Sequence, residues 1–136
     1  MATKRLDGAG TAKMTTLDDA VAVQQRIHGL VEQYALSVKQ NKPGGAFLQN
    51  IKRQVPTLAA LLKAQFGMIS DLVTSVHMQL TRGSSEQMRV RAMREGMAAI
   101  KAQLELAIAH TLQKHEVKED ESGAREVGRG DGSEGG

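Results

Sequence analysis

Apolar residues recur every three or four positions along most of this chain, which is the spacing of one face of an α-helix. Three long stretches carry the pattern and predict helices over residues 16–40, 57–82 and 85–115. A shorter amphipathic piece at 46–55 predicts a connecting helix between the first two. The expected fold class is therefore all-α, with three long helices and one short helix in an antiparallel bundle that forms a single domain of residues 16–116.

Residues that start or stop helices mark the expected boundaries. Thr16 can cap the free N–H groups of the first helix, and the segment 41–45, which contains proline and glycine, ends it. Pro56 lacks a backbone N–H and disfavours helical geometry at the residue before it, so we expect a kink or a break near this position. The alternative is a helix that runs straight through Pro56, and such a helix would start near Ala46 and project past the bundle. Ser84, with Gln87 three residues later, has the pattern of a capping box and begins the last helix.

The helices at 57–82 and 85–115 are joined by a very short turn, which predicts an antiparallel hairpin. Their apolar stripes mesh in one register, as they do in a coiled coil. That register predicts these core pairs: Val76 with Val90, Leu72 with Met93, Ile69 with Met97, Gln65 with Ile100, Leu62 with Leu104, and Leu58 with Ile108. We expect this coiled-coil hairpin to be the stable unit, with the helix at 16–40 packed into its groove.

Both ends of the chain differ in composition from the helical part. Residues 1–15 are polar and contain glycine, and residues 117–136 are acidic and glycine-rich with almost nothing apolar to bury. We expect both to be disordered tails that are dispensable for folding. Charge is divided in a similar way, since residues 16–115 carry twelve Lys and Arg against seven Asp and Glu, whereas residues 116–136 carry three against seven.

Sequence motifs for catalysis or metal binding are missing. The chain has no cysteine, and its four histidines, at 28, 77, 110 and 115, do not have the spacing of a metal site. No glycine-rich phosphate loop or nucleophile motif is present. We therefore expect a protein without a cofactor, a bound metal or an enzymatic activity. Because neither a signal peptide nor a transmembrane segment is evident, we also expect an intracellular protein of the cytoplasm or nucleus that is not secreted.

The outward faces of the last two long helices carry small and apolar residues where a soluble helix normally carries Lys and Glu. Small residues let another helix approach closely, and methionine adapts to varied surfaces. The expected partner-binding residues are Ala60, Ala64, Gly67, Met78, Met88, Ala92, Ala99 and Leu106. This pattern favours a non-enzymatic interaction module, a subunit or adaptor of a multiprotein assembly whose partners are other helical proteins or further copies of this chain.

Basic residues support an alternative hypothesis, in which the protein is a nucleic-acid-associated regulator. A basic collar surrounds the turn between the helices at 57–82 and 85–115, and it consists of Arg82, Arg89, Arg91 and Arg94. These arginines point in different directions and no aromatic residue lies among them for base stacking, which favours the protein-binding hypothesis. A third hypothesis is peripheral contact with an anionic membrane through the piece at 45–55, where Phe47 and Leu48 lie near Lys52.

Overall fold

The computed structural model describes residues 5–82 and 85–117, and this part of the chain is almost entirely helical. Four helices follow one another: α1 (Gly8–Lys39), α2 (Gly45–Leu62), α3 (Gly67–Thr81) and α4 (Glu86–His115). Two very short strands, β1 (Arg5–Leu6) and β2 (Glu116–Val117), pair antiparallel where α1 begins and α4 ends. The predicted all-α class is confirmed.

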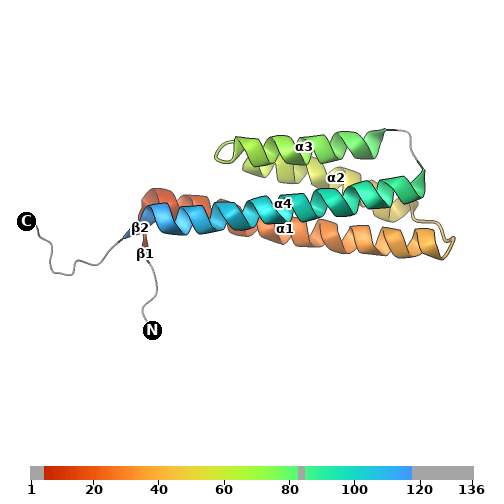
Figure 1. Ribbon diagram of the computed structural model, residues 1–136, viewed down its shortest axis with the longest axis horizontal. Coiled ribbons are helices and arrows are strands. Elements are labelled where there is room, and N and C mark those ends of the chain that lie inside the picture. The colour runs from red at the N-terminus through yellow and green to blue at the C-terminus, as the bar shows by residue number, and fades with distance from the viewer. Residues whose placement is uncertain (1–4, 83–84, 118–136) are drawn as a thin grey trace, which may run out of the picture.

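The two longest helices, α1 and α4, lie side by side and run in opposite directions (Figure 1). The start of α1 meets the end of α4, where the N–H of Asp7 donates to the carbonyl of His115. Helices α2 and α3 lie together on one face of this pair (Figure 1). They cover only part of its length, so that the ends of α1 and α4 nearest β1 and β2 project as a two-helix stem.

The hydrophobic core runs between the helices because each one presents a stripe of apolar residues to the others. Large apolar side chains from three helices are at most 1% exposed, and they include Ile27, Val31, Ile51, Leu58, Leu62, Met93, Met97, Ile100 and Leu104. Helix α3 packs closely on α4 at Gly96. A Cβ atom added there would lie 2.7 Å from a methyl group of Val76, so the absence of a side chain allows this close packing.

Helix α1 begins eight residues before the predicted start at residue 16, so the predicted disordered tail at 1–15 is wrong for the residues that the structure describes. The actual N-cap is Asp7, whose side chain accepts a hydrogen bond from the N–H of Gly10 at 2.7 Å. Thr16 lies inside the helix. Residues 1–4 and 118–136 lie outside the described part of the chain, and only Val117 of the predicted C-terminal tail falls within it, in β2.

Of the alternatives at Pro56, a break is wrong, because α2 begins at Gly45 and continues through this proline. Burial of the same helical face on both sides holds the helix together, since Ile51, Val55 and Leu58 are all fully buried. The chain instead breaks at residues 63–66, within the predicted helix 57–82. There it turns back on itself, and the hydroxyl of Ser70 on α3 donates to the carbonyl of Ala59 on α2 at 2.7 Å.

This break changes the predicted coiled-coil hairpin. Residues 57–62 pack against α3 and α1 as the last part of α2, and only residues 67–81 run along α4. The register differs as well, because Val76 lies against Gly96, six residues beyond its predicted partner Val90. Stripes that repeat about every seven residues fit almost equally well one repeat further along, so periodicity alone does not fix the register.

The start of α4 agrees with the prediction to within one residue, and its end at His115 agrees fully. The cap is Ser85, whose hydroxyl accepts from the N–H of Met88 at 3.2 Å. The predicted cap, Ser84, lies outside the described residues. None of the helices that the structure describes is long and apolar enough to cross a membrane.

Candidate functional site

The eight predicted partner-binding residues lie on three helices and on the turn that follows α2. Ala60 is on α2 and Ala64 in the turn that follows it, whereas Gly67 and Met78 are on α3 and the other four are on α4. Seven of the eight are exposed, and Ala92 is half-buried. The structure brings Gly67 and Leu106 to the same groove, and this groove is the candidate docking site.

We call this groove the notch. It lies where the α2–α3 turn meets the C-terminal half of α4, at the step between the four-helix part and the stem. It encloses about 380 Å³. The α2–α3 side contributes residues 65–69, and the α4 side contributes Gln103, Leu106, Ala107 and His110.

Two large apolar side chains stand open to solvent at the notch. Met68 is 88% exposed and Leu106 is 62% exposed, while Phe66 beside them is half-buried. Met68 was missed by the sequence analysis, which placed it in an uninterrupted helix. The signal that could have found it is Gly67, a poor helix former directly before it. An exposed apolar pair in a groove with glutamine and histidine around it resembles the centre and rim of a protein interface.

Part of the small-residue stripe on α4 is occupied within the molecule. Gly96 lies between Ala92 and Ala99 along this helix, and Val76 of α3 packs directly on it. Ala92 is half-buried and Ala99 is exposed. The small residues of α4 near Gly96 therefore contribute to packing within the protein. Leu106 lies further from Gly96 along the helix and is the stronger candidate for binding a partner.

The basic collar forms contacts with acidic and phenolic groups of the protein. Arg94 binds Glu32 of α1 through two nitrogens, at 3.0 and 2.7 Å. These hydrogen bonds lower the pKa of the Glu32 carboxyl and raise the pKa of the Arg94 guanidinium. Arg91 pairs with Glu95 at 3.3 Å, and Arg89 donates to the hydroxyl of Tyr34 at 3.2 Å. Arg82 is exposed at the end of α3.

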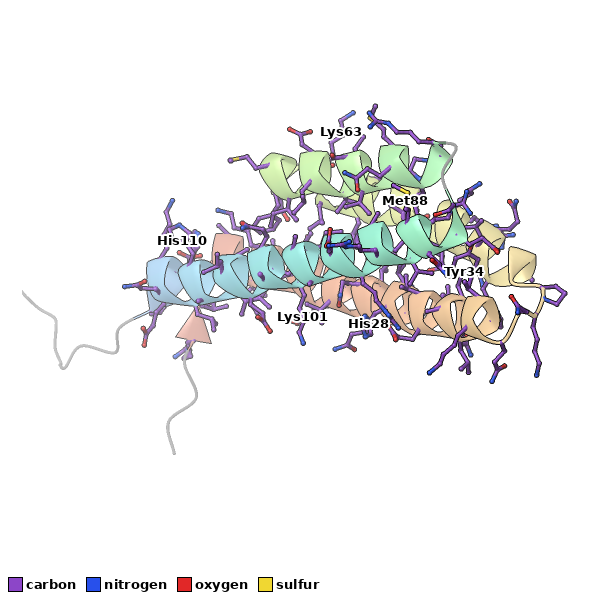
Figure 2. The ribbon with its side chains drawn as sticks, turned by 45° about the vertical axis from the view of Figure 1, so that its right-hand side comes forward. His28, Tyr34, Lys63, Met88, Lys101 and His110 are labelled. Carbon is purple, nitrogen blue, oxygen red and sulfur yellow. The ribbon has the colours of Figure 1, made fainter. Side chains whose placement is uncertain are left out.

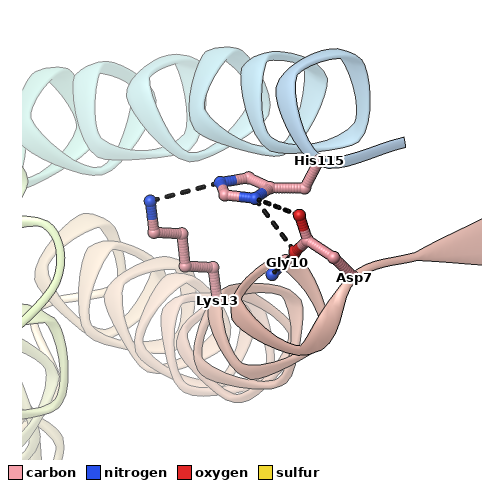
Figure 3. Close-up of polar contacts among 4 residues, drawn as sticks. All are labelled: Asp7, Gly10, Lys13 and His115. Carbon is pink, nitrogen blue, oxygen red and sulfur yellow. Dashed lines mark hydrogen bonds and ion pairs between the residues drawn. The ribbon is translucent and has the colours of Figure 1, made fainter. Parts of the chain in front are cut away.

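A polar cluster closes the end of the stem (Figure 3). The Nδ1 atom of His115 lies 3.1 and 3.2 Å from the two carboxylate oxygens of Asp7, and its Nε2 atom lies 3.4 Å from the Nζ atom of Lys13. The ring packs on Gly10, where an added Cβ would collide with the Cβ of His115. The cluster joins two residues 108 positions apart in the sequence, and it thereby ties the start of α1 to the end of α4.

The pKa of Asp7 is lowered, mainly because its carboxylate accepts the hydrogen bond from Gly10 N–H, with His115 as the second cause. A depressed pKa means that the ionised form stabilises the folded protein above the ordinary value of 3.8, and that this contribution is lost as the pH falls through the lowered pKa. We therefore expect Asp7→Asn, which keeps a capping oxygen, to lower the thermal midpoint at pH 7.

Thermal unfolding followed from neutral to strongly acidic pH would check this expectation. The difference between the wild type and Asp7→Asn should be largest at neutral pH and should disappear at acidic pH, where Asp7 is protonated. Asp19→Asn is the matched control, because Asp19 is exposed and forms no ion pair in the described residues. A constant difference at all pH values would show that the charge of Asp7 does not contribute.

The four histidines lie on three helices: His28 on α1, His77 on α3, and His110 and His115 on α4. Among residues 5–82 and 85–117, no three His, Asp or Glu side chains gather closely enough to hold a metal ion. No protein family, curated protein or solved structure was found to match this chain.

Proposed function

We propose that this protein is a non-enzymatic interaction module, a subunit or adaptor that joins a multiprotein assembly by docking another helical protein at the notch. The observation that supports this proposal most strongly is the exposure of Met68 and Leu106 on opposite sides of one groove. Exposing such side chains to water is unfavourable, whereas burying them against a partner stabilises the complex. In this proposal the assembly is in the cytoplasm or nucleus.

The shape of the notch suits a helix or a helical hairpin as partner. One wall is α4 and the other is the turn between two helices, so neither wall offers a free strand edge to an extended peptide. Burying an apolar side chain of this size stabilises a complex by roughly 1.5–3 kcal/mol. Met68 and Leu106 would therefore act as anchors, and Gln65, Gln103 and His110 could form hydrogen bonds at the rim.

The alternative, binding of a nucleic acid by the basic collar, is supported by the excess of positive charge around the α3–α4 turn. The contacts of the collar count against it. Phosphates would have to compete with Glu32 for Arg94 and with Glu95 for Arg91. A helix-packed complex and a phosphate-bound complex differ in salt dependence, since only the second loses affinity steeply as salt is added.

Capture from the native cell with the wild type and with variants tests the docking proposal. Leu106→Arg should lose the captured helical partner, because arginine would have to be desolvated in the notch. The control is Val117→Arg, since Val117 is 42% exposed in β2 at the end of the stem, outside the notch, and Leu106 is 62% exposed. Both variants should retain the helical circular-dichroism signal and the thermal midpoint of the wild type.

Two results would contradict the proposal. The first is a partner that binds Leu106→Arg and Met68→Glu as strongly as the wild type. The second is a partner that is lost when Arg82, Arg89, Arg91 and Arg94 are replaced by glutamine but is kept in both notch variants. That second result, combined with a steep loss of affinity in salt, would favour the nucleic-acid alternative.

A further inference from the structure

A second groove lies on the face of the α1–α4 pair that α2 and α3 leave open. It consists of two adjoining depressions that share Arg94, one of about 800 Å³ and one of about 300 Å³. On α4, Gly96 marks the side that meets α3. Arg94 and Lys101 lie about 140–160° around the helix from Gly96, at 100° per residue. We call this groove the open-face groove.

Figure 2 shows this side of the molecule, with His28 and Lys101 on the edge of the α1–α4 pair that is turned away from α3. Along α4 the groove extends from Gln87 to Lys101. At 1.5 Å per residue this separation is about 21 Å, which is the length of roughly four helical turns. The open-face groove is therefore long enough to hold a helical segment beside α1 and α4.

Apolar side chains form part of the lining of the groove. Leu36 is 53% exposed, Val90 is half-buried, and Met97 reaches the floor from the core, where it is 1% exposed. A partner that placed an apolar stripe here would cover Leu36 and Val90. A phosphate backbone would gain nothing from these side chains, so the floor favours a protein segment over a nucleic acid.

The rim of the groove is positively charged. Lys39, Arg94 and Lys101 lie along it, and Glu32, the acidic residue in the lining, is already bound to Arg94. Lys39 and Lys101 form no ion pair with the acidic residues that the structure describes. The groove therefore presents two uncompensated ammonium groups, near its two ends, to whatever lies on its floor.

We propose that the open-face groove binds an amphipathic helix whose apolar stripe covers Leu36 and Val90 and whose flanking carboxylates pair with Lys39 and Lys101. This inference goes beyond the docking of a partner at the notch, because the two grooves lie on different faces and share no residue. With both grooves occupied, the protein would join two partners, and only the partner in the open-face groove would need to be acidic.

A synthetic peptide tests this inference without knowledge of the natural partner. The probe is a fluorescent amphipathic helix of Leu and Glu, about 14 residues long to match four turns, and its counterpart has Lys in place of every Glu. The full chain should bind the Leu/Glu peptide saturably in fluorescence anisotropy and should not bind the Leu/Lys peptide. Leu36→Asp and the double variant Lys39→Glu, Lys101→Glu should each weaken binding about tenfold or more.

Leu106→Arg is the matched control and should bind the peptide like the wild type, because it alters only the notch. The inference is overturned if the Leu/Glu peptide fails to bind, or if it binds Leu36→Asp unchanged. It is also overturned if a short duplex DNA or vesicles of anionic phospholipid bind more tightly than the peptide and lose binding only in the double lysine variant. Each of these outcomes leaves the notch proposal intact, since that proposal depends on Met68 and Leu106.

Discussion

Met97→Asp is expected to unfold most of the protein, whereas Ser75→Asp should leave its stability almost unchanged. Met97 is 1% exposed in the centre of the core, and its carbonyl accepts a hydrogen bond from the buried side chain of Gln24. A carboxylate at this position would have to be desolvated among the apolar side chains of the core, and burying a charge in this way costs several kcal/mol. Natural domains are stable by only about 5–15 kcal/mol, so this loss removes a large part of the total.

Urea denaturation followed by circular dichroism would measure both variants. Ser75 is exposed on α3, so Ser75→Asp adds a solvated charge and should shift the midpoint only slightly. Ile69→Asp, which alters a residue that is 8% exposed at the start of α3, should be destabilising too. Similar midpoints for Met97→Asp and Ser75→Asp would mean that α4 does not present Met97 to the core.

Periodicity predicted which face of α4 is buried, because Met93, Met97, Ile100 and Leu104 are all core residues. It could not predict the helix that covers this face. The sequence favoured the neighbouring hairpin partner, yet α4 packs along its whole length on α1 and meets α3 only along part of it. An apolar stripe with a repeat of three or four residues can pack on the apolar face of any neighbouring helix. The turn at 63–66 determines which helix packs on each part of the stripe of α4.

The two grooves escaped prediction for a related reason. The notch exists because the chain turns back at residues 63–66, and this turn places Met68 opposite Leu106. The open-face groove exists because α2 and α3 both lie on the same face of α1–α4. Exposed small and apolar residues can be identified from a helical pattern. Predicting a groove also requires the relative positions of the two elements that form its walls. The exposed Leu106 was therefore identified from the helical pattern, whereas Met68, which follows the turn, was missed.

The start of α1 shows how a distant contact decides a helix boundary. Residues 8–15 contain two glycines and have a weak apolar pattern, so local sequence predicted a tail. In the structure Gly10 packs beneath His115, Met14 packs against the core, and Asp7 both caps α1 and pairs with His115. The helix is extended by contacts with the other end of the chain, which no local pattern contains.

Removing residues 1–15 should therefore destabilise the protein, contrary to the expectation from sequence that this segment is dispensable. The shortened chain would lose the first two turns of α1, the β1–β2 pair and the partners of His115. We expect its thermal midpoint to fall by about 5 °C or more, which corresponds to about 1 kcal/mol for a domain of this size. The last turn of α4 should also lose protection against amide hydrogen exchange, because its neighbour is gone.

A pair of glycine variants separates the contact with His115 from the length of the helix. Alanine at position 10 would place its Cβ against the Cβ of His115, whereas alanine at position 8 would meet no atom within 4 Å. Gly10→Ala should therefore lower the midpoint in the same direction as the deletion, and Gly8→Ala should leave it unchanged or raise it, since alanine favours helix over glycine. If the shortened chain and Gly10→Ala both melted like the wild type, the stem would contribute nothing to stability and the cluster at its end would be a surface contact only.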